Sequence, residues 1–393
     1  MTTTAQNTED AESVDVAVVG GGQAGLAIAW HLRRLGLRFL VLDAGPEIGH
    51  VWRSRWDSLR LFTPARYDAL PGMAFPGPPD THPGKDAVAD YLRDYAAAFD
   101  LPVRTNSPVT RLGRATGGEG YELVTADSTV HARQVVIATG PFQTPAVPRL
   151  AAGLDSTVTQ LHSAQYRNPH SLPPGPVLVV GDGNSGRQIA VELAATRRVD
   201  LACSATATVV PQRLLGRDLF WWLSRLGLVT TGADSRIGRR LRARGELVVG
   251  TTDRMLRAAG VTLRPRLTTA EGTTVGFADG SRSEVGAVVW ATGYRPGYSW
   301  VDVDGVLADG RPRHDRGATP APGLYVLGLP WQHSRGSALL GYVRHDAAHL
   351  ADRIAAHTPQ SGTTGQTWWN HRCDTPAPPA ASNRPSRTEG DLR

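Results

Sequence analysis

Short valine-rich apolar runs alternate along the chain with longer segments that have an apolar face, and this alternation predicts a parallel α/β fold. Residues 14–19 and 38–42 have the pattern of strands that are buried on both faces. Residues 24–35 have helical spacing, and Gly36 is placed to end that helix. The three segments together predict a βαβ unit.

The same pattern returns later in the chain. A second βαβ unit is predicted from Val177, with its second strand at 200–203. The segment 44–83 is rich in Gly, Pro and aromatic residues and is predicted to be an irregular cover. The other predicted elements are a helix at 86–99, short strands within 103–140 and 262–290, an aromatic-rich helix at 213–228, a strand at 323–327 and a closing helix at 337–356.

Each βαβ unit carries a glycine loop with G-x-G-x-x-G spacing. The first loop contains Gly20, Gly22 and Gly25, and the second contains Gly181, Gly183 and Gly186. Such glycines permit a tight turn and a close approach of the backbone to a pyrophosphate, which the following helix N-terminus attracts. A single loop could be a plain turn, but two in this context predict two nucleotides in one protein and redox chemistry between them.

The strand that follows each loop differs at its end. Asp43 is placed to bind a ribose hydroxyl, whereas the second unit has Ser204 and no acid in this region. The absence of an acid permits a 2′-phosphate and favours NADPH over NADH, with Arg187, Arg213 or Arg217 as the cation. Asn184 and Ser185 could add hydrogen bonds to phosphate, and Ser204 could also merely cap its strand.

The two nucleotide units predict a nested arrangement. We expect two Rossmann-like dinucleotide-binding domains, with an NAD(P)H domain at 151–285 inserted into an FAD domain formed by 13–150 and 286–357. Residues 1–12 and 358–393 are polar or rich in Pro, Ser and Thr and are predicted to be disordered.

Composition narrows the function. The net charge is +6, but Lys85 is the only lysine and the arginines lie among acids, which argues against nucleic-acid binding. Cys203 and Cys373 are far apart, so neither a redox-active C-x-x-C pair nor a metal site is expected. The polar N-terminus and the lack of a long apolar run predict no signal peptide and no membrane span, which makes a cytoplasmic location the default.

The segment between the two loops contains His162, Ser163 and Tyr166. With the two loops and the two ATG strand ends, it resembles the linker of the class B flavin-dependent monooxygenases. The similarity covers about residues 13–357 and is greatest to the flavin-containing monooxygenase branch with its short bacterial and plant-type members. Baeyer–Villiger members tend to have Trp where Tyr166 stands, so the resemblance favours oxygenation of a heteroatom.

The resemblance implies FAD and NADPH as cofactors, with NADH possible, and O2 as co-substrate. NADPH would reduce FAD, O2 would form a flavin hydroperoxide, and one oxygen atom would pass to sulfur, nitrogen or a carbon beside a carbonyl of a small molecule. It also implies cofactor contacts from Gln23, Ala24, Gly49, Trp52, Thr139, Gly140, Thr292, Gly293, Gly328, Ser337 and Ala338, and it makes His333, Gln332 and His162 the candidate catalytic residues.

The chain departs from the family at two places. Ser156 and Val158 stand where the family has Phe and Gly, and Phe62–Pro64 stand near the position of an Asn of the animal-type members. An NAD(P)H-dependent flavin oxidase or reductase, a Baeyer–Villiger-type oxygenase and a non-enzymatic flavin redox sensor therefore remain alternatives. The aromatic stripe Phe220–Trp222 could be core, the wall of a substrate tunnel or a peripheral membrane contact.

Overall fold

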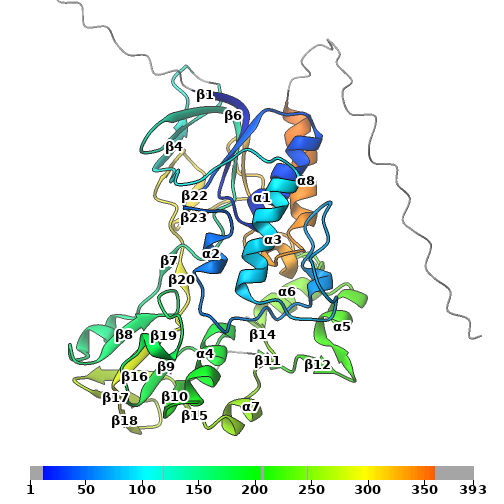
Figure 1. Cartoon of the computed structure of the whole chain (residues 1–393). Helices are drawn as coiled ribbons and strands as arrows, with labels where there is room; N and C mark the ends of the chain where they lie inside the picture. Colours follow the sequence, from blue (N-terminus) through cyan, green and yellow to red (C-terminus); the bar gives the residue numbers. More distant parts are fainter. Residues whose placement is uncertain (1–11, 118, 205–207, 246, 359–393) are drawn as a thin grey trace, which may run out of the picture. The chain divides into compact units, whose positions relative to one another are not determined.

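The computed structural model describes residues 12–117, 119–204, 208–245 and 247–358 (Figure 1). The described residues from Glu12 to His357 form one compact unit. The segments predicted to be disordered fall outside the described residues, except for Glu12 and Thr358.

An eight-stranded sheet carries the first glycine loop. Its central strands are parallel, and an antiparallel arm formed by β4 and β5 continues it beyond β6. Helix α1 packs against α3 and α8 on one side of this sheet (Figure 1). The strands are β1 (Glu12–Val19), β2 (Phe39–Leu42), β3 (Val103–Arg104), β4 (Arg111–Arg114), β5 (Tyr121–Val124), β6 (Thr129–Ile137), β21 (Val301–Asp302) and β24 (Leu324–Val326), and the helices are α1 (Gln23–Arg34), α3 (Lys85–Ala98) and α8 (Arg344–His357).

A five-stranded parallel sheet carries the second glycine loop. Helix α4 packs on one face of β9 and β10, and a three-stranded antiparallel sheet packs on the opposite face through Val275 and Phe277. The parallel strands are β8 (Thr159–His162), β9 (Val177–Val180), β10 (Val199–Ala202), β15 (Thr262–Arg264) and β19 (Ala287–Trp290), the antiparallel ones are β16 (Leu267–Glu271), β17 (Thr274–Phe277) and β18 (Arg282–Glu284), and the helix is α4 (Asn184–Ala194).

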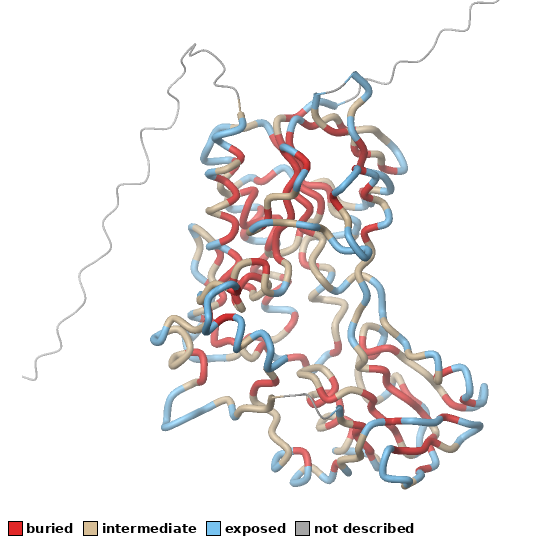
Figure 2. Tube along the Cα trace, turned by 180° about the vertical axis from the view of Figure 1, so that it is seen from behind, coloured by how far each residue is buried: buried red, intermediate tan, exposed pale blue. Residues whose placement is uncertain are grey.

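Strand β19 pairs with β8 and β9 in this second sheet. The predicted boundary after residue 285 would therefore divide a sheet, so it has to move beyond Trp290. The chain crosses between the sheets twice, in β7 (Thr144–Pro145) and β20 (Tyr294–Arg295), which pair with each other as antiparallel strands. Buried residues are concentrated in the strands of the two sheets, and Figure 2 shows the chain coloured by burial.

Two predicted helices are wrong in part. Residues 213–218 form a hairpin instead of a helix, because Leu215 and Gly216 adopt positive φ values of 49° and 75°. Residues 339–343 separate a short 3-10 turn from the closing helix. Gly341 interrupts the helix because it packs directly on the backbone of Tyr67, where a Cβ would lie 2.1 Å from the carbonyl oxygen. The elements concerned are β12 (Arg213–Leu214), β13 (Arg217–Asp218), α5 (Leu219–Arg225) and η4 (Arg335–Ala338).

The segment predicted as an irregular cover contains only two short helical turns among long stretches of loop. The remaining elements are α2 (His50–Arg53), η1 (Ala65–Tyr67), η2 (Arg149–Gly153), η3 (Pro169–Ser171), β11 (Thr208–Val210), α6 (Arg236–Ala243), β14 (Leu247–Val249), α7 (Asp253–Ala258), β22 (Leu307–Ala308) and β23 (Arg311–Pro312).

Candidate functional site

The first glycine of each loop lies against the end of a neighbouring strand. Gly20 and Gly181 have φ values of 109° and 106°, a region that L side chains rarely adopt. A Cβ on Gly20 would lie 2.6 Å from the carbonyl oxygen of Ala138, and one on Gly181 would lie 2.4 Å from that of Ala291. Both alanines belong to the ATG motifs, so each motif forms the floor of a glycine loop.

The other two glycines of each loop serve different purposes. A Cβ on Gly25 or Gly186 would lie 1.8 Å from the carbonyl oxygen of the first glycine in the same loop, so these two glycines let helix and strand pack closely. A Cβ on Gly22 or Gly183 would meet no atom of the described residues within 4 Å. The protein's own packing therefore does not require the middle glycines, which leave room for a ligand to approach the backbone.

The helices that follow the two loops have free N-terminal amides. Gly22 caps α1 and Gly183 caps α4, in both cases without a side-chain hydrogen bond. Helix α3 also begins at a glycine, Gly84, without such a bond, whereas α5, α6 and α7 are capped by Asp218, Ser235 and Thr252. Uncapped amides at the positive end of a helix bind anions, so both loops fit the pyrophosphate of a dinucleotide.

Asp43 joins the end of β2 to the first loop. Its Oδ2 accepts a hydrogen bond from the Gly21 amide at 2.5 Å, and its Oδ1 accepts one from the Gly45 amide at 2.8 Å. The side chain is half-buried, and each carboxylate oxygen can accept a further hydrogen bond. Asp43 is therefore fixed where it could also bind a ribose hydroxyl.

In the second loop the carboxylate belongs to the loop itself. Asp182 is buried, and its Oδ1 accepts hydrogen bonds from the Ser204 amide at 3.0 Å and hydroxyl at 3.1 Å. The connection between loop and strand end is thus the same as in the first unit, but donor and acceptor have exchanged places. The exposed position beyond the second strand carries the hydroxyl of Ser204 instead of a carboxylate.

Two residues that the sequence assigned to phosphate binding are engaged within the protein. Arg187 is buried, donates to Asp253 at 2.7 Å and to the Asp182 carbonyl oxygen at 2.9 Å, and is therefore not a ligand for a 2′-phosphate. Asn184 accepts a hydrogen bond from the Val249 amide at 2.9 Å and donates to the Leu247 carbonyl at 3.2 Å, so it ties α4 to β14.

The other predicted phosphate ligands are less constrained. Ser185 is half-buried in the first turn of α4. Arg213 and Arg217 lie on the hairpin, where Arg213 donates to the Gly216 carbonyl at 2.8 Å and the Arg217 guanidinium lies over the Trp221 ring at 5.4 Å.

Several predicted contacts meet at the first turn of α1. The Trp52 indole donates to Oε1 of Gln23 at 3.3 Å. Gly49 begins the helix that carries Trp52, and a Cβ on it would lie 2.7 Å from the Ala89 carbonyl oxygen. A Cβ on Gly328 would lie 2.8 Å from that of Ala24, so the end of β24 also reaches this turn.

The ATG motifs also fix the two crossing segments. Thr139 accepts a hydrogen bond from the Gln143 amide group at 2.8 Å, and the Thr292 hydroxyl donates to the Ala146 carbonyl at 2.5 Å. Gly140 and Gly293 follow with φ values of 70° and 77°, which glycine adopts without strain. The chain therefore leaves both sheets at defined angles.

His162 lies at this crossing. It is buried, its Nδ1 accepts from the Ala164 amide at 3.1 Å, and its Nε2 lies 2.9 Å from the Gly293 carbonyl oxygen. Burial lowers the pKa of His162, and the neutral Nε2–H tautomer satisfies both contacts. These hydrogen bonds favour a positioning role for His162.

The rest of the linker motif is also tied into the second sheet region. The Tyr166 hydroxyl donates to Glu192 of α4 at 2.8 Å, and the Ser163 amide donates to the Trp290 carbonyl at 2.9 Å. In this chain the motif therefore fastens the linker to the sheet that carries the second loop.

The turn after β24 is held from within. Gln332 is buried, and its Oε1 accepts from the Leu329 amide at 3.3 Å. Ser337 accepts from the backbone amides of His333 at 3.1 Å and Ser334 at 3.0 Å. Ser337 and Ala338 thus belong to the 3-10 turn η4. The prediction that they open the closing helix is therefore wrong.

The side chains of Trp331 and His333 are among those of this turn that remain partly exposed. Trp331 has a φ of 59°, which is uncommon for a bulky residue and often marks a functional position. The His333 ring lies against Gly232, where a Cβ would be 3.4 Å from its Cε1. Gln332 therefore shapes the turn, and His333 is the side chain of the predicted pair that a ligand could reach.

Sequence reasoning missed a buried carboxyl group. Asp68 is fully buried, its Oδ1 accepts from the Thr63 hydroxyl at 2.6 Å, and its Oδ2 has no partner among the described residues. Burial raises the pKa of Asp68 to about 7. Next to it, the Tyr67 ring stacks on that of Tyr342 at 6.2 Å. No local pattern distinguishes Asp68 from an exposed loop aspartate.

The aromatic stripe divides between two environments. Phe220 is buried and stacks on Phe62 at 5.8 Å, so core packing accounts for it. Trp221 and Trp222 remain half-exposed.

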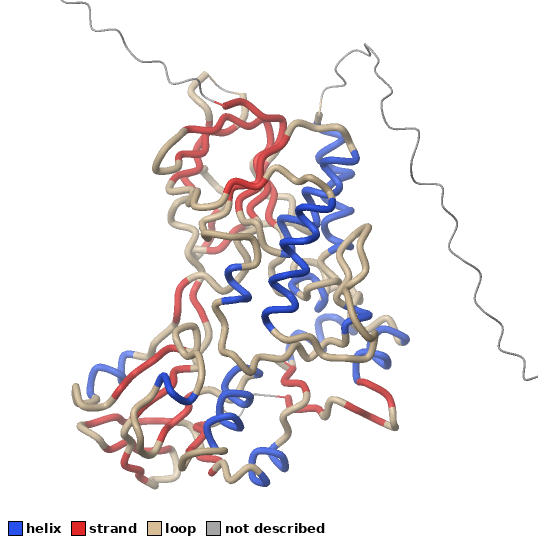
Figure 3. The backbone as a smooth tube through the Cα atoms, viewed as in Figure 1, coloured by secondary structure: helices blue, strands red, loops and turns tan. Residues whose placement is uncertain are grey.

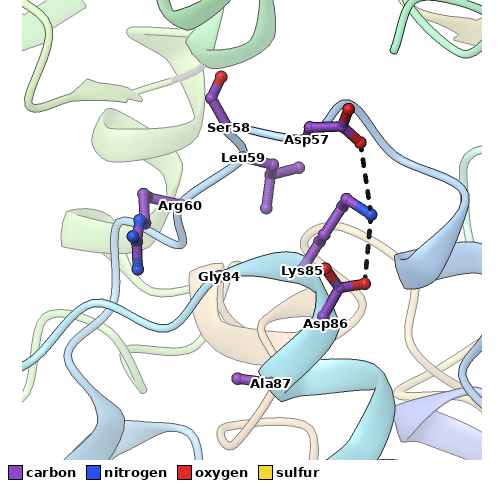
Figure 4. Close-up of a pocket in the computed structure, with 8 residues that line it drawn as sticks. All are labelled: Asp57, Ser58, Leu59, Arg60, Gly84, Lys85, Asp86 and Ala87. Atoms are coloured by element: carbon purple, nitrogen blue, oxygen red, sulfur yellow. Dashed lines mark hydrogen bonds and ion pairs between the residues drawn. The ribbon is translucent and has the colours of Figure 1, made fainter. Parts of the chain in front are cut away.

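A polar cavity of about 340 Å³ lies beside the second unit (Figure 4). Lys85 reaches between Asp86 at 3.2 Å and Asp57 at 3.7 Å. At the rim, the Gln188 side chain of α4 donates to the Arg60 carbonyl at 3.1 Å. The lining residues are Asp57, Ser58, Leu59, Arg60, Gly84, Lys85, Asp86 and Ala87.

Two Rossmann-type units with uncapped glycine loops define a two-dinucleotide oxidoreductase. The family model described as pyridine nucleotide-disulphide oxidoreductase matches residues 17–210. An oxidoreductase CzcO-like of Geobacillus kaustophilus is 42% identical over 346 residues, with 88% of this chain and 99% of the relative covered. The chain belongs to the flavin monooxygenase family, within a group that includes these CzcO-like oxidoreductases.

Two further relatives agree with this membership. The indole-3-pyruvate monooxygenase YUCCA4 of Oryza sativa is 28% identical, with 79% of this chain and 82% of the relative covered. The structure of a flavin-containing monooxygenase from Stenotrophomonas maltophilia is 29% identical with a TM-score of 0.73, covering 88% of this chain and 99% of that one. The protein is therefore a flavin-dependent oxidoreductase. In the described residues, no helix has the length and apolar character needed to cross a bilayer.

Proposed function

We propose that this protein catalyses the NADPH-dependent oxygenation of a nucleophilic sulfur or nitrogen atom in a small molecule. In this proposal FAD binds at the first glycine loop and NADPH at the second. The observation that carries the assignment is the opposite placement of the two carboxylates: Asp43 lies half-exposed beyond its strand, whereas Asp182 is buried within its loop.

This placement favours different nucleotides at the two loops. A carboxylate at the strand end binds a ribose 2′-hydroxyl and repels a 2′-phosphate, so Asp43 suits the adenosine ribose of FAD. Beyond the second strand, Ser204 offers a hydroxyl and no negative charge, which permits the 2′-phosphate of NADPH. Because Arg187 is buried and paired with Asp253, the cation for that phosphate must come from another residue.

Bound FAD would supply the chemistry of hydride acceptance and oxygen activation. The chain's own residues position the components. The uncapped amides at α1 and α4 bind the two pyrophosphates, and Trp52 and Gly328 border the first turn of α1. His162 and the threonines of the ATG motifs hold the crossing segments, while Gln332 and Ser337 shape the turn that presents His333.

The similarity to the flavin-containing monooxygenase of Stenotrophomonas maltophilia supports monooxygenation, and Tyr166 in the linker supports a heteroatom as the oxygenated atom. A second candidate is oxygenation of a carbon beside a carbonyl. The similarity to an enzyme named indole-3-pyruvate monooxygenase and the plant-type Phe62–Pro64 segment favour it. The two candidates share the cofactor sites and differ in substrate.

Oxygen incorporation tests this proposal directly. The purified protein with FAD is supplied with NADPH and ¹⁸O2, together with an aryl methyl sulfide, a tertiary amine or an aromatic 2-oxo acid. We expect ¹⁸O in the sulfoxide or N-oxide, with less peroxide than NADPH consumed. Label only in the decarboxylated acid would favour the second candidate, while complete conversion of NADPH to peroxide with every probe would favour an oxidase. Flavin that NADPH does not reduce would favour a redox sensor.

A further inference from the structure

Residues 211–245 carry the whole positive excess of the chain. This segment contains eight arginines and two aspartates, a net charge of +6 that equals the net charge of all 393 residues. All eight arginines are exposed, and within the described residues none of them forms an ion pair. They are Arg213, Arg217, Arg225, Arg236, Arg239, Arg240, Arg242 and Arg244.

The same segment exposes apolar side chains at the tip of the β12–β13 hairpin. Leu214 and Leu215 are 48% and 82% exposed, and Figure 3 shows the hairpin projecting from the elements around it. Leu215 also has a φ of 49°, a conformation that asparagine or glycine adopts with less strain. The two-residue turn accounts for this backbone conformation, but it does not require an apolar side chain, so a leucine that is 82% exposed here indicates an external contact.

Hydrogen bonds hold the tip in place. The Trp222 indole donates to the Leu214 carbonyl at 2.9 Å, which joins the hairpin to α5. At the base, the Gln212 side chain donates to the Phe62 carbonyl and to Asp218, at 2.9 and 2.8 Å. The hairpin is therefore anchored at its base and presents its apolar tip to solvent.

Helix α6 repeats the combination of exposed apolar and cationic residues. Ile237, which is 57% exposed, and the half-buried Leu241 are four positions apart and share one face. Arg236, Arg240 and Arg244 follow at the same spacing. A basic helix with a partly exposed apolar face is typical of segments that lie on a membrane surface.

We infer that the hairpin β12–β13, α5 and α6 form a docking surface for an anionic lipid bilayer, with Leu215 entering the headgroup region and the arginines binding lipid phosphates. We call this set of elements the arginine-rich surface. Leu226, which is 64% exposed, and the half-exposed Trp221 and Trp222 add side chains that suit a membrane interface. A nucleic acid would use the arginines but would leave the leucines in water.

The chain's own C-terminal tail does not supply the negative charge that would bind the arginine-rich surface. Residues 359–393 contain four arginines against three acidic residues, so the tail is itself slightly cationic. Removing the tail should therefore leave lipid binding unchanged.

Vesicle sedimentation tests the inference with the full FAD-loaded protein. We expect binding to vesicles of equal parts phosphatidylglycerol and phosphatidylcholine and at least about tenfold weaker binding to phosphatidylcholine alone, because each cation near an anionic surface contributes about fivefold. Leu215→Asn, which suits the left-handed turn, and the triple variant Arg236→Gln, Arg240→Gln, Arg244→Gln should each bind at least about fivefold more weakly.

Matched variants elsewhere serve as controls. Leu35→Asn replaces a leucine that is 44% exposed, and Arg282→Gln, Arg311→Gln, Arg313→Gln neutralise three exposed arginines. Both controls should bind vesicles like the parent, and all variants should keep FAD and their rate of NADPH oxidation.

Four results would overturn the inference. The first is absence of binding to anionic vesicles, and the second is an equal loss of binding in the control variants. The third is binding to duplex DNA that is as strong as vesicle binding and is not weakened by Leu215→Asn, which would indicate a general polyanion site. The fourth is a dimer in light scattering that Leu215→Asn converts to a monomer, which would indicate an interface between two copies of the chain.

Discussion

The two glycine loops have closely similar backbones, and in each unit a carboxylate joins the loop to the end of the neighbouring strand. The carboxylate belongs to the strand end in the first unit and to the loop in the second. In the first unit, Asp43 at the strand end accepts from the loop amide of Gly21. In the second, Asp182 in the loop accepts from Ser204 beyond the strand end. The connection is the same, but only the first unit leaves a half-exposed carboxylate near a bound ribose.

This exchange separates structural roles from ligand roles. The protein's own packing requires the first and third glycines of each loop, because a Cβ at these positions would lie 1.8 to 2.6 Å from a backbone oxygen. The middle glycines and the uncapped helix ends are left for the nucleotide. Nucleotide preference then depends on whether the strand end or the loop supplies the carboxylate. Packing of the loop, binding of the pyrophosphate and choice of nucleotide can therefore be altered separately by substitution.

The largest effect is expected from Gly20→Ala. Its Cβ would lie 2.6 Å from the Ala138 carbonyl, at a φ of 109°, so the loop has to shift, at a cost of about 2 kcal/mol or more. We expect a protein that purifies almost free of FAD, measured by the ratio of flavin to protein absorbance. Gly181→Ala should instead retain FAD and lose reduction by NADPH. Full flavin content in Gly20→Ala would refute the assignment of the first loop.

Gly22→Ala should act on the ligand and spare the fold. Because its Cβ meets nothing within 4 Å, the melting temperature of the flavin-free protein should stay unchanged. A methyl group beside the pyrophosphate should weaken FAD binding about tenfold or more, measured by titration of the flavin-free protein. A lower melting temperature would show that the middle glycine is structural as well.

Cys203→Asp places an acid directly after β10, as Asp43 follows β2. A carboxylate there should repel a 2′-phosphate and raise the KM for NADPH relative to NADH about tenfold. Cys203→Asn, which has the same shape without the charge, is the matched control. An equal rise of both KM values would indicate damage to the loop, and no change would place the phosphate elsewhere.

The smallest effect concerns the Cys203 thiol in a Cys373→Ser background. Burial, with a further contribution from Asp182, raises the pKa of Cys203 to about 11. Because the thiolate is the reactive form, alkylation should rise with pH until about 11 and be slow at neutral pH. Asp182→Asn should lower this midpoint and raise the rate at pH 9 about twofold to fivefold, whereas Asp43→Asn should not. A midpoint near 8.5 would contradict the buried environment.

Local patterns were sufficient to predict the two βαβ units, because a buried strand, a glycine loop and an amphipathic helix each depend on neighbouring residues. The helix predicted at 213–228 failed because its first six residues form a hairpin anchored by Gln212 to Phe62, 150 positions away. The closing helix was interrupted because Gly341 packs on the backbone of Tyr67.

The same distinction applies to the site. The glycines and Asp43 follow from spacing. The structure brings Gln23, Ala24, Trp52 and Gly328 together at the first turn of α1, and their contact with the cofactor stays a prediction. In contrast, Arg187 and Asn184 were assigned to phosphate because their residue types suit it, while their actual partners Asp253 and Val249 lie more than 60 positions away. The buried carboxyl of Asp68 likewise depends on distant packing that no local pattern records.

Anaerobic reduction of the flavin tests the central claim most directly, namely that FAD at the first loop receives electrons from NADPH at the second. Parent and Gly183→Ala are mixed with NADPH, and the flavin absorbance is followed. We predict that Gly183→Ala keeps its FAD and is reduced at least about tenfold more slowly at the same NADPH concentration. Equal rates of reduction, or loss of FAD from Gly183→Ala, would contradict the account.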